Sequence, residues 1–222
     1  MKSLILDIET GPGPLAKIEP LLPPIAAPSN WKDPAKIEAY LAEKRESLIA
    51  DAALSAVTGR VLAVGLLRDA DPWFITDENE GDLLGKTWRE LDCRKAGESV
   101  VTFCGHRFDL PFLARRSWAL GVPVPVWFPR DGRFPRRAFT DLAEVWACGD
   151  RSETISLDRL AKLVGLPGKT GDGADFARLF ATDRKAALDY LANDLRLTRA
   201  IFERLAFPEY VPEERPLEAV AV

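Results

Sequence analysis

Apolar residues along the chain follow two patterns: short runs typical of strands, and helical spacings typical of amphipathic helices. Strands are predicted near residues 2–9, 60–67, 73–76, 99–103 and 138–142, and helices near 33–49, 80–91, 111–120, 156–164, 175–179 and 184–205. Strands that alternate with helices in this way are typical of a mixed α/β sheet. The hydrophobic pattern therefore predicts an α/β fold.

Proline is concentrated between residues 12 and 32, where it removes backbone donors and interrupts both strands and helices. This stretch is expected to be an extended surface loop, followed by a helix that Asp33 caps and Pro34 begins. We predict a single domain over residues 1–207, with a proline-rich and helical insertion at about 12–57 and a terminal tail over 208–222. The sequence leaves open whether the insertion is a lid.

Composition narrows the class of protein. The 222 residues carry a net charge of −4, without the strongly basic balance of a tight duplex binder, so any contact with nucleic acid is expected to be local and transient. The three cysteines lack metal-type spacing and are expected to be reduced. No apolar run approaches the ~20 residues that cross a bilayer, and no signal-peptide pattern is present. We expect a cytoplasmic protein without membrane contact.

Acidic residues supply the candidate chemistry. Asp7 and Glu9 end the first apolar run and share one face of the predicted strand, where a hard cation such as Mg²⁺ or Mn²⁺ would neutralise their repulsion. A strand that simply runs into a solvated acidic turn is the alternative. Asp109 follows the buried strand at 99–103 and a turn at Gly105, although an acid there can also merely complement a helix dipole.

The final predicted helix carries Tyr190 and Asp194, which are four residues apart and therefore lie on one face. Taken in order, Asp7, Glu9, Asp109 and Asp194 with Tyr190 resemble the three motifs of the DEDD 3′-to-5′ exonuclease superfamily, in its tyrosine-bearing (DEDDy) branch. The likeness is greatest to stand-alone bacterial proteins related to the proofreading exonuclease domain of family B DNA polymerases. Further stretches that resemble this group are 54–65, 141–146 and 156–161.

The chain has one histidine, His106, and it lies in the second motif, whereas the sister branch needs a histidine five residues before the last acid. The resemblance implies a ribonuclease H-like fold, with a central mixed five-stranded sheet flanked by helices. It also implies two divalent metal ions, Mg²⁺ or Mn²⁺. In this scheme Asp7 bridges both ions, Glu9 and Asp194 complete the first, and Asp109 holds the second directly or through water.

Tyr190 would then orient the attacking water, because a free phenol with a pKa near 10 is a poor base at neutral pH. Weaker candidates for contact with substrate are Thr10, Cys104, His106, Phe108, Arg136 and Arg137. Cys104 departs from the asparagine that is usual in the second motif, which leaves substrate positioning open. The arginines of this loop could equally be solvated, and phenylalanines near the motifs could belong to the core.

The resemblance implies an exonuclease that hydrolyses single-stranded DNA or frayed 3′ ends and releases nucleoside monophosphates. Two alternatives stay open at this point. The same motifs could act on RNA, because they read phosphate rather than sugar. The fold could also survive as a nucleic-acid-binding module that has lost turnover. The glycine-rich stretches at 11–14 and 165–170 have the wrong spacing for a phosphate-binding loop, and we assign neither that role.

Overall fold

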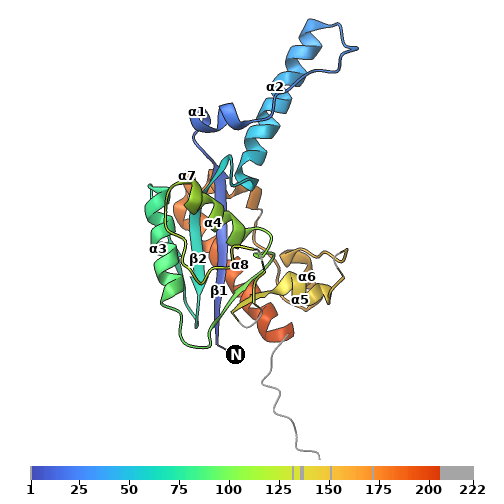
Figure 1. The fold of residues 1–222 in the computed structure, drawn as a ribbon. Coiled ribbons are helices and arrows are strands. Elements are labelled where there is room, and N and C mark those ends of the chain that lie inside the picture. Colours follow the sequence, from blue (N-terminus) through green and yellow to red (C-terminus); the bar gives the residue numbers. More distant parts are fainter. Residues whose placement is uncertain (1, 132, 136–137, 151, 172, 206–222) are drawn as a thin grey trace, which may run out of the picture.

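The structure, a computed structural model, describes residues 2–131, 133–135, 138–150, 152–171 and 173–205. Its centre is a sheet in the order β3-β2-β1-β4-β5. The strands are β1 (Ser3–Pro12), β2 (Gly59–Leu67), β3 (Pro72–Ile75), β4 (Ser99–Thr102) and β5 (Phe139–Asp141). Because β1 is antiparallel to β2 and parallel to β4, the sheet is mixed, and the predicted five-stranded α/β architecture is confirmed (Figure 1).

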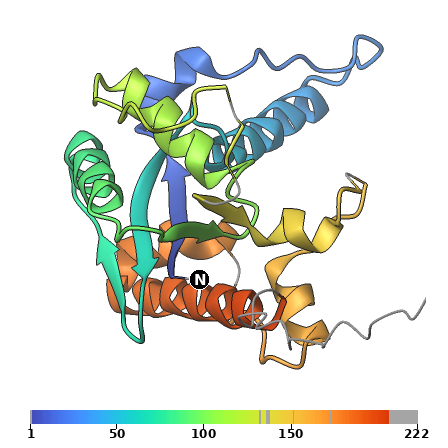
Figure 2. The same ribbon diagram turned by 60° about the horizontal axis from the view of Figure 1, so that its bottom comes forward.

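Helices cover both faces of this sheet because β1 is apolar on both sides. Leu4, Leu6 and Ile8 point into a core beneath α3 (Glu80–Asp92) and α4 (Asp109–Ala119). Ile5 points the opposite way, into a second core beneath the long helix α8 (Arg184–Leu205). Figure 2 shows α8 crossing one face of the sheet and α4 lying on the other. The shorter helices are α5 (Leu142–Ala147), α6 (Leu157–Leu163) and α7 (Phe176–Thr182).

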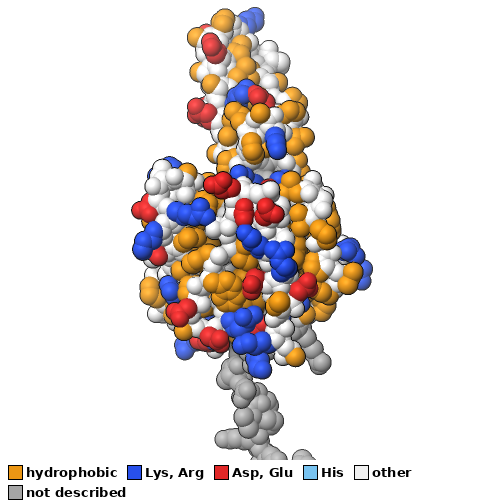
Figure 3. All heavy atoms as spheres, turned by 90° about the vertical axis from the view of Figure 1, so that its left-hand side faces the viewer, with side chains coloured by type: hydrophobic (Ala, Val, Ile, Leu, Met, Phe, Trp, Pro, Cys, Tyr) orange, Lys and Arg blue, Asp and Glu red, His pale blue; other side chains and the backbone are white. Residues whose placement is uncertain are grey.

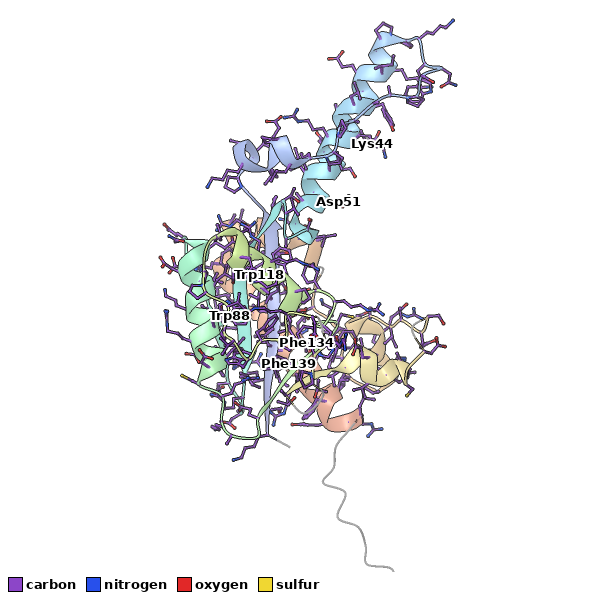
Figure 4. The ribbon with its side chains drawn as sticks, in the orientation of Figure 1. Lys44, Asp51, Trp88, Trp118, Phe134 and Phe139 are labelled. Carbon is purple, nitrogen blue, oxygen red and sulfur yellow. The ribbon has the colours of Figure 1, made fainter. Side chains whose placement is uncertain are left out.

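The first core is rich in aromatic side chains. Trp88 of α3 is buried, and its indole N–H donates to Ser117 Oγ at 2.9 Å, so its one polar atom is satisfied. Phe139 of β5 packs edge-on against Phe134 with ring centroids 5.3 Å apart. Figure 4 labels Trp88, Phe134 and Phe139, together with Trp118, which is 51% exposed near the end of α4.

The first strand is longer than its sequence indicates. It runs on to Pro12 with a bulge between Glu9 and Thr10, so Asp7 and Glu9 lie within the strand rather than at its tip. The neighbouring strand β4 pairs only with Ser3 to Ile5. Beyond Ile5, one edge of β1 therefore has no strand beside it, and this open edge lies next to the two acids.

The predicted insertion forms an arm, defined here as residues 13–58, which projects from the end of β1 (Figure 1). The expected extended loop is only partly correct, because α1 (Leu15–Ile18) and a 3-10 helix (Glu19–Leu21) interrupt it. Helix α2 (Pro34–Asp51) begins as predicted, with Asp33 accepting from the backbone N–H groups of Ala35 and Lys36. A 3-10 helix (Ala52–Leu54) leads back to β2.

A short strand at 138–142 was predicted, but two short helical segments near it and before α7 were not. The piece at 138–142 is a three-residue strand followed by α5, which Asp141 caps by accepting from the N–H of Ala143 at 3.0 Å. A further 3-10 turn (Gly173–Asp175) precedes α7. Within the described ranges, no helix combines the length and apolar character needed to span a membrane. The predicted tail at 208–222 lies outside those ranges.

Candidate active site

Three carboxylates meet between β1 and α8. Asp7 and Glu9 share the face of β1 on which Ile5 packs against α8, and Asp194 of that helix faces them. Oxygen atoms of the three side chains lie within 4.8 Å of one another. Glu9 is 8% exposed and Asp194 only 2%, so water screens this cluster poorly.

A glycine in β2 sets how closely α8 approaches the sheet. Gly65 is paired with Asp7 in the ladder and faces the helix. A Cβ at this position would lie 2.8 Å from Leu195 Cδ1 and 2.9 Å from Leu191 Cγ, closer than carbon atoms normally approach. The missing side chain lets α8 settle onto β2, and this places Asp194 within reach of β1.

The fourth acid arrives from the opposite face, at the open edge of β1. Asp109 is the first residue of α4 and is 3% exposed. Its Oδ1 accepts from the backbone N–H of Ile8 at 2.9 Å, which satisfies a strand donor that β4 does not reach. The Asp109 carboxyl group also interacts with that of Asp7, and each affects the pKa of the other. The structure thus brings together all four predicted acids.

Burial and mutual repulsion shift the acids toward their protonated forms. Burial, followed by the charge of Asp194, raises the pKa of Asp7 from 3.8 to about 7. Burial and then the charge of Asp7 raise the pKa of Glu9 and of Asp109 well above their ordinary values. The pKa of Asp194 is also raised by burial. Fully ionised, the cluster would therefore hold more negative charge than its surroundings balance.

Lys169 partly compensates this charge, and the sequence did not identify it. Its Nζ lies 2.6 Å from Asp194 Oδ2 and 5.0 Å from the centroid of the Tyr190 ring. Burial alone would lower its pKa, but the hydrogen bond and charge of Asp194 outweigh burial and the pKa is raised. The only signal was the glycine-rich stretch at 165–170, whose spacing excludes a phosphate loop but says nothing about its lysine.

The backbone before Lys169 is held at two points. Asp158 Oδ1 accepts from the Lys169 N–H at 3.0 Å, and Asn193 Nδ2 donates to the Gly168 carbonyl at 3.4 Å. Gly168 has a φ of 89°, a conformation that L side chains rarely adopt, and a Cβ there would lie 2.7 Å from Asp158 Oδ1. This turn directs the Lys169 ammonium into the acid cluster.

Tyr190 lies one helical turn before Asp194 and is 6% exposed. Its ring is covered by the same glycine-rich segment, since a Cβ on Gly171 would lie 3.1 Å from Tyr190 Cδ2. Among the described residues, its hydroxyl and Asp194 Oδ1 are both buried without a hydrogen-bond partner. Burial, and then the charge of Asp194, raise the pKa of Tyr190 far above its ordinary value, so the phenol stays protonated.

The turn of the second motif is organised by Asp141. Its two oxygens accept from the backbone N–H groups of Cys104 and His106, each at 2.9 Å. Cys104 has a φ of 62°, and burial raises the pKa of its thiol to about 11. The His106 ring stacks on Phe134 and its Nδ1 lies 3.0 Å from Glu144 Oε2.

His106, Asp141 and Glu144 also offer ligand atoms within 4.8 Å of one another. Because Asp141 is already occupied by backbone donors, we interpret this group as support for the turn. The other predicted substrate contacts stay predictions. Thr10 Oγ1 donates to the carbonyl of Ala53 at 2.8 Å, while Phe108 packs on Phe112 with centroids 5.3 Å apart.

Only some arginines of the loop that was predicted to contact substrate are among the described residues. Arg136 and Arg137 lie outside the described residues. In the same loop, Arg133 pairs with Asp131 and is exposed, and Arg130 donates to the carbonyl of Val124 at 3.4 Å. Neither described guanidinium takes part in the acid cluster.

Comparison with known proteins places this site in a family. The family described as predicted 3′-5′ exonucleases related to the exonuclease domain of PolB matches residues 38–209. The chain belongs to this family. The match contains Asp109, Lys169, Tyr190 and Asp194, whereas Asp7 and Glu9 precede it.

Two proteins to which this chain is similar, one in sequence and one in structure, are DNA polymerases. DNA polymerase 1 of Aeropyrum pernix is 32% identical over 111 residues, which cover 45% of this chain and 11% of the polymerase. The family B DNA polymerase of Pyrobaculum calidifontis matches in structure with a TM-score of 0.54 and 18% identity, covering 92% of this chain and 24% of that one. The structural likeness confirms the ribonuclease H-like fold. The chain spans only a small part of each polymerase's length.

Proposed function

We propose that this chain is a metal-dependent 3′-to-5′ exonuclease that hydrolyses single-stranded DNA or frayed 3′ ends and releases nucleoside monophosphates. The observation that carries the proposal is the convergence of Asp7, Glu9, Asp109 and Asp194 from β1, α4 and α8. Four carboxylates packed together without equal positive charge are costly unless cations join them. Membership of an exonuclease family supports the same conclusion.

The residues present fit two divalent ions such as Mg²⁺ or Mn²⁺. All four ligands are carboxylates, which these hard cations prefer, and Asp194 Oδ1 is buried without a partner among the described residues. Asp7 is central, since it contacts the group of Glu9 and Asp194 as well as Asp109, and would contribute to both ions. Bound there, the ions would stabilise charge on the attacking and leaving oxygens of the phosphodiester.

Two neighbouring side chains would position the reactants. The Tyr190 hydroxyl stays protonated and can donate a hydrogen bond, so it is suited to orient a water rather than to remove its proton. Lys169 is charged and forms a salt bridge with Asp194 of the cluster. Its ammonium can hold Asp194 in place or approach the substrate phosphate. The tyrosine-bearing subtype of the DEDD superfamily therefore describes this site best.

The test is digestion of single-stranded DNA and RNA, each labelled at the 3′ or the 5′ end, with Mg²⁺ or Mn²⁺ and with a chelator. We expect stepwise loss from the 3′ end with DNA, and no hydrolysis by the Asp7→Asn variant. Asp69→Asn is the matched control, because it removes an exposed carboxylate just beyond the far end of β2.

The two alternative functions predict different results in this digestion experiment. Faster degradation of RNA would assign the substrate to that polymer instead. Binding of either strand without hydrolysis under any metal condition would indicate a nucleic-acid-binding module. Hydrolysis by Asp7→Asn at the parental rate would refute the metal site.

A further inference from the structure

Most of the arm is exposed and packs little against other parts of the protein. None of the 18 residues of α2 is fully buried. The arm is attached beside the acids, since Thr10 donates to the Ala53 carbonyl and the Gly13 N–H donates to that of Thr58 at 2.8 Å. In Figure 3 it stands clear of the body as a separate projection. A projection anchored one and four residues beyond Glu9 is well placed to contact the substrate of the acids.

One side of the arm combines aromatic rings with lysines. The rings of Trp31 and Tyr40 meet edge to face with centroids 5.3 Å apart. Lys36 Nζ lies 4.2 Å from the Trp31 ring centroid and Lys44 Nζ lies 5.8 Å from that of Tyr40. Because Lys36, Tyr40 and Lys44 are spaced by four, they form a stripe along α2. These three residues together with Trp31 are called the arm stripe below.

The arm carries five basic and six acidic residues, so any positive charge at the arm stripe is local. Within the described part of the chain, neither lysine of the arm stripe forms an ion pair with a carboxylate, unlike Lys86, Lys162 and Lys185. Glu19 of the arm pairs with Arg45 instead, and both line the apolar hollow beneath α2. Glu43 lies next to Lys44 in the sequence, but no ion pair joins the two among the described residues. The stripe therefore presents positive charge beside partly exposed rings.

We propose that the arm stripe binds a single-stranded stretch of nucleic acid belonging to the same molecule whose 3′ end lies at the acids. The proposal rests on the exonuclease function proposed above. Lysines beside aromatic rings are suited to phosphates and unstacked bases, and such contacts are tolerant of sequence. A few local lysines on a chain of net charge −4 suit a flexible single strand better than a rigid duplex.

Distances along the chain predict which substrates can reach the stripe. Glu9 is three residues from the end of β1, about 10 Å at the strand rise. Lys44 and Lys36 lie seven and 15 residues from the base of α2 at Asp51, or about 10 and 22 Å further at the helical rise (Figure 4). A stacked trinucleotide spans only about 10 Å. It can occupy the acids without touching the stripe, whereas a longer strand can reach both.

The experiment compares a trinucleotide with a single strand of about twenty nucleotides, longer than the ~4–16 nucleotide sites of single-strand binders. The variant is Lys36→Gln with Lys44→Gln, which keeps helix propensity and removes two charges. The matched control is Lys2→Gln with Lys95→Gln, because both lysines are exposed and line a hollow at the opposite end of the sheet. KM and kcat are measured for each at several salt concentrations.

We expect KM for the long strand to rise about 5- to 20-fold in the arm variant with kcat unchanged. The slope of log affinity against log salt should flatten by about 1.4, the value for two lost contacts to a single strand. The trinucleotide should be cleaved normally, and the control variant should match the parent on both substrates.

An unchanged KM and salt slope for the long strand would overturn the proposal and leave the stripe to a protein partner. Equal losses on both substrates would overturn it as well, since the trinucleotide at the acids falls short of the arm stripe. Absence of cleavage of either substrate by the parent would instead refute the exonuclease function. In that case polarisation of a labelled 20-mer still tests the arm, because binding needs no turnover and should weaken by the same factor in the arm variant.

Discussion

Asp7 is predicted to destabilise the metal-free protein while being required for its function. The residue lies on the central strand against Glu9 and Asp194, and its carboxyl group interacts with that of Asp109. Substitution by asparagine keeps the shape of the side chain and removes its charge. We therefore expect Asp7→Asn to abolish hydrolysis and to raise the free energy of unfolding of the metal-free chain.

The magnitude follows from the pKa of Asp7, which is about 7 in the folded protein against an ordinary value of 3.8. Below pH 3.8 both states are protonated and the residue costs nothing. Between pH 3.8 and 7 the unfolded state loses its proton first, so stability falls as pH rises. Above pH 7 the full cost is at most about 4 kcal/mol, at 1.36 kcal/mol per pH unit. Subtracting about 1 kcal/mol for a weakened hydrogen bond leaves a gain of about 3 kcal/mol for the variant.

Thermal unfolding at pH 8 with a chelator measures this gain. For a chain of this length, about 3 kcal/mol corresponds to a rise in Tm of about 6 to 12 °C. The rise should shrink toward zero at pH 4, where Asp7 is protonated in the folded parent. Added Mn²⁺ should stabilise the parent by mass action and the variant much less, which narrows the difference. Asp69→Asn, an exposed acid, should leave Tm unchanged in all conditions.

A variant no more stable than the parent at pH 8 would show that Asp7 is not under electrostatic strain. A gain of equal size at pH 4 and pH 8 would show that packing, rather than charge, explains the effect. Either result would remove the electrostatic argument for a cation at this site.

Four further predictions follow from the same geometry. Lys169→Met should cost about 1 to 3 kcal/mol in the metal-free protein, because it leaves Asp194 buried and unpaired, and Mn²⁺ should restore part of this loss in thermal unfolding. Gly65→Ala should cost about 1 to 3 kcal/mol by urea unfolding and reduce kcat, since its Cβ pushes α8 away from β1. Cys104→Asn should stabilise the protein to urea by about 0.5 to 1 kcal/mol, because asparagine tolerates a φ of 62° better than cysteine. Tyr190→Phe should lower kcat about 10- to 100-fold in steady-state assays with KM nearly unchanged, as expected for a residue that orients water.

The fold could be predicted where local pattern and tertiary structure agree. The alternation of Leu4, Leu6 and Ile8 with Ile5 marks a strand buried on both faces, and the sheet places it at the centre. The Asp33-Pro34 signature fixes the start of α2, because capping is a local interaction. Helix α5 was missed since six residues are too few to show a helical period. The length of β1 depends on β2, which pairs with it as far as Pro12.

The acids could be predicted as a set only by resemblance, because no local rule brings Asp109 and Asp194 to the same strand. The structure shows two physical reasons why Asp109 and Asp194 come to lie beside β1. Asp109 replaces a strand partner that β4 is too short to provide, and Asp194 is carried in by a helix that Gly65 allows to approach. Both depend on what is absent, a ladder partner and a Cβ, and absences of this kind are invisible in periodicity.

Lys169 shows why the residue that compensates the charge of a site is harder to predict from sequence than the acids that form the site. Its position depends on a backbone turn at Gly168 and on Asp158, which precedes it by eleven residues, so neither spacing nor composition marks it. One ammonium cannot balance four carboxylates, and the raised pKa of Asp7 and of Asp194 persists despite it. The chain thus holds its acids together with only partial compensation. Cation binding would remove the free-energy cost of this uncompensated charge. The stability of the fold is in this way linked to its proposed chemistry.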